Sequence, residues 1–423
     1  MTYQRRIIDG LLDDVFGDLA AIAIEGAKGV GKTATATQRA RTVVNLALPA
    51  QRATIAGNLR HVTELEPPVL IDEWQLEPSV WDVVKSAVDT DRSGGQFLLA
   101  GSAGVAPGVR IHSGAGRIVR LMMRPLSIAE RGIADPTVSL ATLLAGDRPA
   151  ITGRSEVTLS GYVDEILASG FPGIRDLAPR ARTLQLGSYI DRIVDHELPE
   201  NGIEVRRPDA LRRWLQAYGA ATSSDTTYTK ILDAATPGDD EKPARGTVIG
   251  YREHLARIFV LDPLPAWSTA FNPLKSLTKS PKHHLVDPAI AAHLVGVGRA
   301  GLLRGEGQRV GVHVGTWLGA LFESLTAQSV RVYAGAADSR VGHLRTSDTD
   351  REIDLIVEGP DRSVVAIEVK LADTVHDADV KHLNWLEDQL GPRLADKMVI
   401  TTGEFAYRRA DGVAVVPLAL LGP

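Results

Sequence analysis

A glycine-rich turn near the N-terminus constrains the fold of this chain more than any other feature. The turn follows the apolar run 21–24 and precedes a helix-forming run that begins at Lys32. Its residues are Gly26, Ala27, Lys28, Gly29, Val30, Gly31, Lys32 and Thr33. Successive backbone N–H groups in such a turn, with the N-terminus of the next helix, present partial positive charge to phosphates. We therefore predict a phosphate-binding loop, or P-loop, between a strand and a helix.

The residue types in the P-loop predict its ligand. Gly26, Gly29 and Gly31 supply the backbone freedom that lets the chain curl around phosphate oxygens. Lys32 is expected to neutralise the β- and γ-phosphates of ATP, and the Thr33 hydroxyl is expected to ligate Mg²⁺. ATP and Mg²⁺ are therefore the predicted cofactors, with all of the P-loop in contact with the nucleotide.

An acidic pair, Asp72 and Glu73, ends the next predicted strand, which begins at Val69 after two prolines. From a strand end in the same sheet, Asp72 can reach the magnesium shell, and Glu73 can polarise the attacking water as general base. The alternative is an ordinary acidic strand end without a catalytic role. The separation from the P-loop leaves room for an intervening helix and strand, which favours the catalytic interpretation.

Two further residues are weaker candidates for catalysis. Ser102 follows a third apolar strand, 97–100, where its hydroxyl could contact the γ-phosphate or the water; it could equally be an ordinary loop serine. Arg117 ends the glycine-containing segment 113–117 and could stabilise transition-state charge, or lie at the surface without such a role. If Arg117 acts on the nucleotide of a neighbour, hydrolysis requires a homo-oligomer.

Composition narrows the class of protein. The chain has 423 residues, no cysteine and a net charge of -5. Disulfides, thiolate zinc sites and cysteine nucleophiles are thereby excluded. No run of about 18 apolar residues and no signal-like start is present, so we expect a cytoplasmic protein without membrane association. The charge leaves room for a local basic groove but does not indicate nucleic-acid binding.

Two alternating segments near the C-terminus, 352–358 and 364–370, predict a β-hairpin. If the register is symmetric about Asp361, Asp354 lies opposite Glu368, with Cβ atoms ~5 Å apart. Two carboxylates at that distance can share a divalent cation. Lys370 projects from the same face and could activate water or stabilise charge on a phosphate.

This constellation is that of a magnesium-dependent PD-(D/E)XK nuclease, with Glu323 from the preceding helical segment as a possible fourth member. The alternative is a half-exposed hairpin, in which the apolar residues face the core and the charged ones face water. A third possibility is a nuclease-like fold that is kept only as a binding platform. The residues alone leave these interpretations open.

The middle of the chain predicts three short helices, near 211–222, 227–235 and 247–258, followed by the apolar segment 259–261. This order indicates a winged-helix unit. The third helix carries few basic residues, so packing between domains competes with insertion into a DNA groove. The polar loop 237–243 separates the second and third helices.

Several short sequence fragments follow one another along the chain in a specific order. They are 5–9 (RRIID), 71–75 (IDEWQ), 100–102 (AGS), 124–127 (RPLS), 170–172 (GFP), 189–194 (YIDRIV), 281–284 (PKHH) with Asp287, 322–323 (FE), 352–354 (EID) and 367–370 (IEVK). Together they resemble bacterial and archaeal AAA-type ATPases fused to a C-terminal domain of unknown function with a nuclease-like core. The resemblance implies the roles given above for Lys32, Thr33, Asp72 and Glu73. It departs from the usual pattern in the loop 237–243, which makes DNA reading by the third helix less certain.

The expected architecture is α/β, because short apolar runs alternate with helical stretches as in a parallel sheet covered on both faces. We expect a P-loop ATPase domain over 1–150 and a helical lid or linker over 151–205. A winged-helix-like domain over 206–270 and a restriction-endonuclease-like domain over 271–423 are implied by the resemblance.

We expect an AAA-type protein that binds and hydrolyses ATP. Its nucleotide state would control C-terminal domains that bind DNA or a protein partner. One alternative is an ATP-regulated, magnesium-dependent DNA nuclease. Another is a regulatory or defence module that holds nucleotide without turnover.

Overall fold

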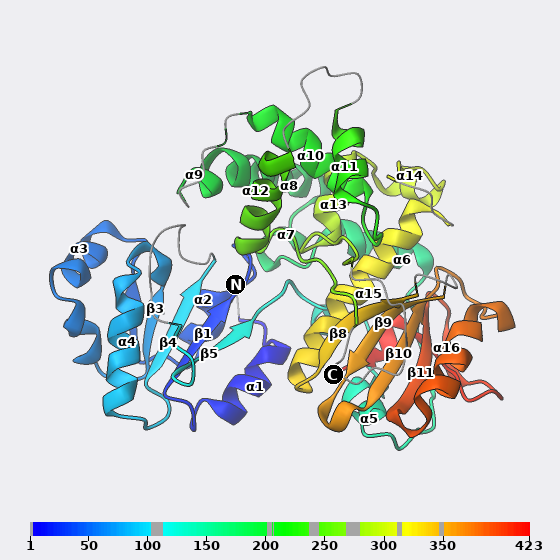
Figure 1. Ribbon diagram of the computed structural model, residues 1–423, viewed down its shortest axis with the longest axis horizontal. Coiled ribbons are helices and arrows are strands. Elements are labelled where there is room, and N and C mark those ends of the chain that lie inside the picture. The colour runs from blue at the N-terminus through cyan, green and yellow to red at the C-terminus, as the bar shows by residue number, and fades with distance from the viewer. Residues whose placement is uncertain are drawn as a thin grey trace. The chain divides into compact units, whose positions relative to one another are not determined.

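The structure, a computed structural model, divides into two compact units, each built from three stretches of the chain (Figure 1). The described residues are 3–102, 113–200, 205, 207–236, 245–267, 280–310, 315–346 and 351–423. The first unit takes residues 1–125, 189–206 and 249–260, and the second takes 126–188, 207–248 and 261–423. The four expected segments stay a prediction, because these units group residues by contact and each draws on separate stretches.

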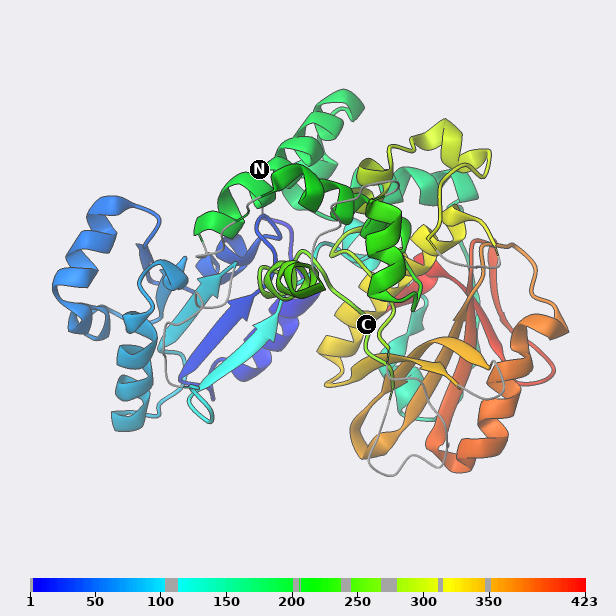
Figure 2. The same ribbon diagram turned by 45° about the horizontal axis from the view of Figure 1, so that its top comes forward.

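The first unit is built on a five-stranded sheet of order β2-β3-β4-β1-β5, and every pairing in it is parallel (Figure 2). Its strands are β1 (Ala21–Glu25), β2 (Thr42–Asn45), β3 (Val69–Asp72), β4 (Phe97–Gly101) and β5 (Ile118–Met122). The predicted parallel sheet is therefore confirmed, with strands that end at the acidic pair and just before the loop serine.

Both faces of the first sheet are buried. Consecutive residues of one strand, such as Ile22 and Ala23, point to opposite faces and are both fully inaccessible to solvent. Helix α4 (Ser79–Thr90) packs on one face through side chains such as Trp81 and Val84, which join Leu99 in one apolar cluster. The other helices of the residues 1–125 stretch are α1 (Ile7–Val15), α2 (Lys32–Thr37) and α3 (Pro49–Gly57), with short 3₁₀ turns at Leu59–Thr63 and Trp74–Leu76. Burial on both faces explains why the strands are continuous apolar runs.

Two later stretches complete the first unit. Helix α8 (Pro179–Arg192) begins in residues of the second unit and ends in residues of the first, where a π-helical turn, Ile193–Glu197, and α9 (Leu198–Glu200) follow it. Helix α12 (Arg245–Arg257) likewise passes from the second unit to the first at residue 249. Two continuous helices are thus shared by the units.

The three middle helices are divided between the two units, and the winged-helix unit stays a prediction. Helices α10 (Pro208–Ala220) and α11 (Tyr228–Ala235) belong to the second unit, whereas α12 belongs to the first from residue 249. The described residues 259–261 make only an isolated bridge, from Leu261 to Leu285. The loop 237–243 lies outside the described residues.

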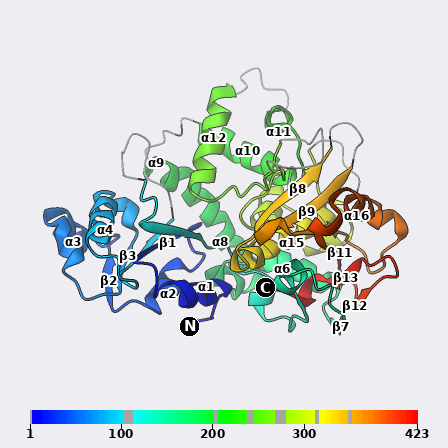
Figure 3. The ribbon, with the colours of Figure 1, turned by 60° about the horizontal axis from the view of Figure 1, so that its bottom comes forward.

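The second unit is built on a mixed seven-stranded sheet of order β7-β12-β13-β11-β10-β9-β8 (Figure 3). Its strands are β7 (Gly153–Arg154), β8 (Arg340–Arg345), β9 (Glu352–Glu358), β10 (Val364–Val369), β11 (Leu394–Thr401), β12 (Phe405–Arg408) and β13 (Ala414–Pro417). The pairs β10–β11 and β11–β13 are parallel, and the other pairs are antiparallel. A separate two-stranded piece joins β6 (Val138–Ser139) to β14 (Leu421–Gly422).

The predicted hairpin is confirmed with its predicted register. Val364 pairs with Glu358 and Ile367 with Leu355, which is symmetric about Asp361. A register shift between β8 and β9 lies next to Asp354, between the pairings of Ile356 and Ile353. Such a bulge re-aims side chains, so it changes the surroundings of Asp354 without changing its partner strand.

The half-exposed interpretation of this hairpin is wrong. Ile353 and Leu355 are buried, and so is Ile356, which the strict alternation assigned to the opposite face. Helix α16 (Asp377–Leu390) covers the sheet in one apolar cluster, while α15 (Trp317–Ala336) also contacts β8, β9 and β10. Two helices that flank the hairpin in the sequence thus pack on the sheet, and Asp354, which the pattern left at the surface, is buried.

The remaining helices of the second unit are α5 (Leu140–Leu144), α6 (Leu159–Ala168), α7 (Pro172–Arg175), α13 (Pro288–Val295) and α14 (Arg299–Leu303). After α6 the chain turns at Ser169, which has a positive φ of 71°. None of the helices in the described ranges is long and apolar enough to cross a membrane.

Candidate nucleotide site and C-terminal charged cluster

The P-loop needs glycine at specific positions. Gly26 has φ 155°, and a Cβ there would lie 2.1 Å from the carbonyl oxygen of Met123. Gly29 and Gly31 have φ values of 85° and 107°, and Gly31 caps the start of α2. A side chain at any of these positions would strain or displace the loop. The predicted backbone role of the three glycines therefore matches their conformations.

Lys32 folds back over its own loop. Its ammonium donates to the carbonyl oxygens of Gly26, at 2.8 Å, and Ala27, at 2.9 Å. Burial lowers the pKa of Lys32 to about 8, against the opposing charges of Glu73 and Asp72. The amine is thus held in the loop by two neutral partners, in a place where an anion would stabilise its charge strongly.

The two predicted magnesium ligands are in contact. The Thr33 hydroxyl donates to Oδ1 of Asp72 at 2.9 Å. Asp72 is the last residue of β3 and is buried, and this burial raises its pKa. Since β4 alone separates β3 from β1, the carboxyl ends of these strands bring Asp72 to the P-loop. Both oxygens are of the kind that Mg²⁺ prefers.

Glu73 is held by two neighbours. It adopts a left-handed backbone, with φ 55°, directly after β3. The Ser102 hydroxyl donates to Oε2 of Glu73 at 3.4 Å, and the Gln75 amide donates to the same oxygen. Ser102 therefore lies beside the predicted base. The sequence did not single out Gln75 for a role, because its contact depends on the tight turn at residue 73.

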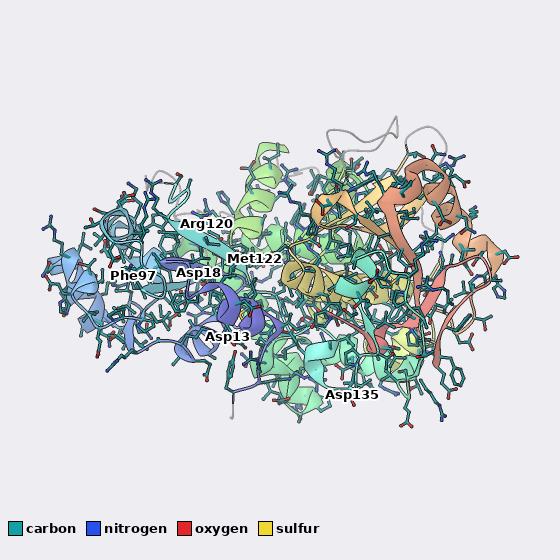
Figure 4. All side chains as sticks on the ribbon, turned by 90° about the horizontal axis from the view of Figure 1, so that it is seen from below. Asp13, Asp18, Phe97, Arg120, Met122 and Asp135 are labelled. Carbon is teal, nitrogen blue, oxygen red and sulfur yellow. The ribbon has the colours of Figure 1, made fainter. Side chains whose placement is uncertain are left out.

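Arg117 lies near the amino ends of the strands, whereas the P-loop of the same chain lies at their carboxyl ends. Ile118 pairs with Ala21 at the amino end of β1, whereas the P-loop follows Glu25 at the carboxyl end. In Figure 4, Phe97 marks the amino ends of the strands and Met122 marks their carboxyl ends.

The five residues of β1, from Ala21 to Glu25, span ~13 Å over four residue steps. The Arg117 guanidinium instead donates to Asp89 at 2.7 Å, on a carboxylate that also pairs with Lys85 at 2.6 Å. In its own chain Arg117 thus lies near the amino ends of the parallel strands, opposite the ends that carry the P-loop. Its catalytic role, on its own or a neighbouring nucleotide, stays a prediction.

The tip of the P-loop contacts the segment that follows α8. The Lys28 ammonium pairs with Glu197 at 2.5 Å, and the Tyr189 hydroxyl donates to the Lys28 carbonyl at 3.3 Å. Arg192 lies 3.4 Å from the same Glu197 oxygen. Glu197 ends the π-helical turn, a feature that is frequent at functional sites.

A cavity of about 110 Å³ lies beside the P-loop. It is lined by Lys28, Gly29, Ser102, Tyr189, Arg192, Ile193, Glu197, Ile258 and Val260. Arg192 and Glu197 were missed as site residues, although 189–194 was one of the fragments that carried the family resemblance. Their distance from the loop in sequence hides this contact.

Family models match three parts of the chain. Residues 19–131 match an AAA domain, residues 160–300 match a domain of unknown function (DUF8612) and residues 318–421 match another (DUF4143). The AAA match contains the P-loop, the acidic pair and the whole five-stranded sheet. The first unit contains an AAA-type P-loop domain.

Two curated proteins and one solved structure are similar to this chain. An uncharacterized protein of Mycobacterium tuberculosis is 24% identical over 373 residues, which cover 87% of this chain and 72% of that protein. One from Mycobacterium bovis matches to the same extent. A Walker-type ATPase of Pyrococcus abyssi is 16% identical, with a TM-score of 0.40 over 68% of this chain and 94% of that one. That score is too low to carry a structural argument.

A buried arginine supports the loop of the AAA domain from below. Arg6 donates to the Val30 carbonyl at 2.9 Å and to the Arg124 carbonyl at 2.8 Å. Asp9 accepts from the Arg6 backbone at 2.6 Å and pairs with Arg39 at 2.6 Å. The 5–9 and 124–127 fragments therefore meet at the P-loop.

Outside the AAA domain, the predicted C-terminal residues gather around a lysine. The Lys282 ammonium lies 2.9 Å from Glu323 Oε1, 2.8 Å from Glu352 Oε1 and 2.8 Å from Asp354 Oδ1. Its side chain is only 2% exposed. We call these residues, with Glu368 and Lys370, the charged cluster. Sequence reasoning missed Lys282, because nothing local indicates that residue 282 reaches β9.

The rest of the charged cluster is held by short contacts. Lys370 pairs with Glu368 at 2.8 Å, and Asp354 accepts from the Val369 backbone at 2.9 Å. Burial raises the pKa of Glu323 and of Glu368 to about 8. Burial also disfavours the charge of Lys282, but Asp354, Glu323 and Glu352 together raise its pKa well above the ordinary value. The four predicted residues are thus brought together.

Among the described residues, no group of three or more histidine, aspartate or glutamate side chains is arranged to hold a metal ion. In the charged cluster the oxygens that could do so converge on an ammonium group instead. The cluster therefore contains the residues predicted for a nuclease site, but a lysine ammonium lies where that prediction has a metal ion.

Proposed function

We propose that this chain binds ATP together with Mg²⁺ at residues 26–33 and hydrolyses the ATP. The 2.9 Å bond between the Thr33 hydroxyl and Asp72 carries this proposal. It joins the side chains whose oxygens hold Mg²⁺ in the proposed complex, one from the P-loop and one from a strand end. The close approach of Gly26 to Met123 supports the same cradle, because it keeps the loop backbone free of side chains.

Each charged group has a distinct role in this proposal. Lys32 exchanges its two carbonyl partners for phosphate oxygens, an interaction that burial strengthens. Glu73 accepts a proton from the attacking water, while Ser102 and Gln75 orient its carboxylate. Bound Mg²⁺ supplies charge neutralisation at the phosphates.

Phosphate release in the presence of Mg²⁺ tests these roles. Lys32→Ala should abolish nucleotide binding, and Glu73→Gln should retain binding but lower turnover by roughly 10²- to 10⁴-fold, the usual contribution of a general base. Lys85→Ala is the control, because Lys85 pairs with Asp89 near Arg117 and at a distance from the P-loop. Equal phosphate release by the natural chain and Lys32→Ala would exclude the proposed ATPase. Nucleotide that stays bound after purification, without turnover at high protein concentration, would favour a non-hydrolysing module.

We further propose that the nucleotide state controls the second unit, which binds DNA or a protein partner. Helix α8 supports this proposal, since one end belongs to the second unit and the other leads directly to Glu197, the partner of Lys28. A phosphate that draws Lys28 away from Glu197 acts on the end of that helix. The coupling then requires no loop to transmit it.

DNA and protein partners are separated by one titration. A fluorescent DNA duplex is titrated with Glu73→Gln, a variant intended to hold ATP, with and without nucleotide. An affinity that changes with ATP supports DNA as the partner. DNA binding that is absent, or equal with and without ATP, would count against DNA as the partner. The protein partner would then be sought by affinity capture.

A further inference from the structure

We propose that the charged cluster is a metal-free cross-link, in which the Lys282 ammonium takes the place that a divalent cation fills in a nuclease. The family resemblance implies Mg²⁺ at Asp354 and Glu368, and the side chains present do not fit it. The second unit then uses this sheet for structure and binding instead of metal-dependent cleavage. This inference is independent of the proposed ATPase.

The position of Lys282 carries the proposal. Its Nζ atom lies within 2.9 Å of oxygens from Glu323, Glu352 and Asp354, and Asp354 is one of the two carboxylates at which the resemblance implies Mg²⁺. Oxygen ligands surround Mg²⁺ at ~2.1 Å and Ca²⁺ at ~2.3–2.6 Å, so a metal held by these three atoms must occupy nearly the same point. Two cations cannot share it, because like charges repel strongly at such short range.

Lys282 is also fixed at its backbone. Its N–H donates to the Leu264 carbonyl at 2.9 Å, and its own carbonyl accepts from the Leu264 N–H at 2.9 Å. Both backbone groups are thus paired, and the side chain is only 2% exposed. The cation is therefore part of the fold.

Each carboxylate of the cluster contacts one of two lysines. Glu323, Glu352 and Asp354 share Lys282, while Glu368 pairs with Lys370 at 2.8 Å. These residues come from α15, β9, β10 and the segment before α13. Buried carboxylates of this kind need a partner to be stable. Lys282 thus links three parts of the second unit at one point.

Mn²⁺ binding to the full-length, nucleotide-free chain tests the proposal by titration with electron paramagnetic resonance. The natural chain and Asp354→Asn should bind Mn²⁺ equally, since Asp354 holds no metal. Lys282→Met should gain a Mn²⁺ site, which the double variant Lys282→Met with Asp354→Asn should lose. Lys370→Met is the matched control and should gain none, because Lys282 is still in place.

Thermal unfolding gives a second measurement. Lys282→Met leaves three carboxylates without their cation, so its midpoint should fall and Mn²⁺ should restore it. Mn²⁺ should restore no stability to Lys370→Met. A Mn²⁺ site in the natural chain that Asp354→Asn removes would overturn the proposal. So would a Lys282→Met chain that neither binds Mn²⁺ nor is stabilised by it.

Discussion

At the scale of single residues, Lys32 combines burial with partners that carry no formal charge. Its ammonium contacts two carbonyl oxygens, and burial brings its pKa from 10.5 to about 8. The charge that the P-loop offers to phosphate is therefore sensitive to pH in a range where an exposed lysine is not. Two consequences of opposite sign follow.

We expect nucleotide affinity to fall as the pH rises above about 8, by up to tenfold per pH unit for the loss of one proton. Phosphates raise the pKa of Lys32 in the complex, so binding takes up a proton near and above this pH. Calorimetry of nucleotide binding in buffers of different ionisation enthalpy measures that uptake. An affinity that is constant between pH 7 and pH 9.5 would contradict this expectation.

The stability of the nucleotide-free chain should change in the other direction. Folded Lys32 loses its proton near pH 8, whereas the unfolded residue keeps it up to about 10.5. Because the unfolded state binds more protons in this window, the contribution of Lys32 to the free energy of unfolding rises with pH. Unfolding curves of the natural chain and Lys32→Met separate this contribution from those of other groups.

At the scale of elements, we expect the π-helical turn after α8 to compete with nucleotide for Lys28 of the P-loop. Its Glu197 carboxylate holds Lys28 at 2.5 Å, and Arg192 lies on the same oxygen. A phosphate near Lys28 offers that lysine a stronger anionic partner than one carboxylate. The end of α8 is therefore the element most directly exposed to the nucleotide state.

Glu197→Gln should bind nucleotide severalfold more tightly, because it removes the competing charge and keeps the size of the side chain. Hydrogen exchange over residues 189–200 should differ between free and ATP-bound natural chain, and this difference should shrink in the variant. Glu253→Gln is the control, an exposed position on α12. Weaker nucleotide binding by Glu197→Gln would indicate that Glu197 supports the loop instead of competing with its ligand.

At the scale of the whole molecule, the arginine predicted to be catalytic lies at the opposite end of the strands from the P-loop of its own chain. Arg117 pairs with Asp89 at 2.7 Å near the amino end of the strands. If Arg117 takes part in hydrolysis, we expect it to contact the nucleotide of another copy of the chain. Turnover would then depend on assembly.

We expect turnover per chain to rise with protein concentration, and Arg117→Ala to lower it by roughly 10³-fold if Arg117 acts as an arginine finger. Mixing Arg117→Ala with Lys32→Ala should restore part of the activity, because each variant supplies what the other lacks. Lys85→Ala is the matched control, since Lys85 shares the Asp89 carboxylate. If Arg117→Ala and Lys85→Ala lose the same amount of turnover, and mixing with Lys32→Ala restores none, Arg117 only forms a surface ion pair.

Local sequence is sufficient for features that depend on neighbouring residues. The P-loop glycines, the strand ending at Asp72 and the hairpin symmetric about Asp361 all follow from short-range spacing, and the structure contains each of them. Backbone conformation and strand register are set over a few residues, so they can be read from the pattern.

Contacts between distant segments decide the rest. Lys282 reaches β9 across more than 70 positions, Glu197 reaches Lys28 across 169, and α12 is buried in a different unit from α10. Such contacts depend on which segments the fold brings together, and no local period records that. The P-loop domain was therefore predictable from the sequence, whereas the centre of the charged cluster and the position of Arg117 required the arrangement of the strands.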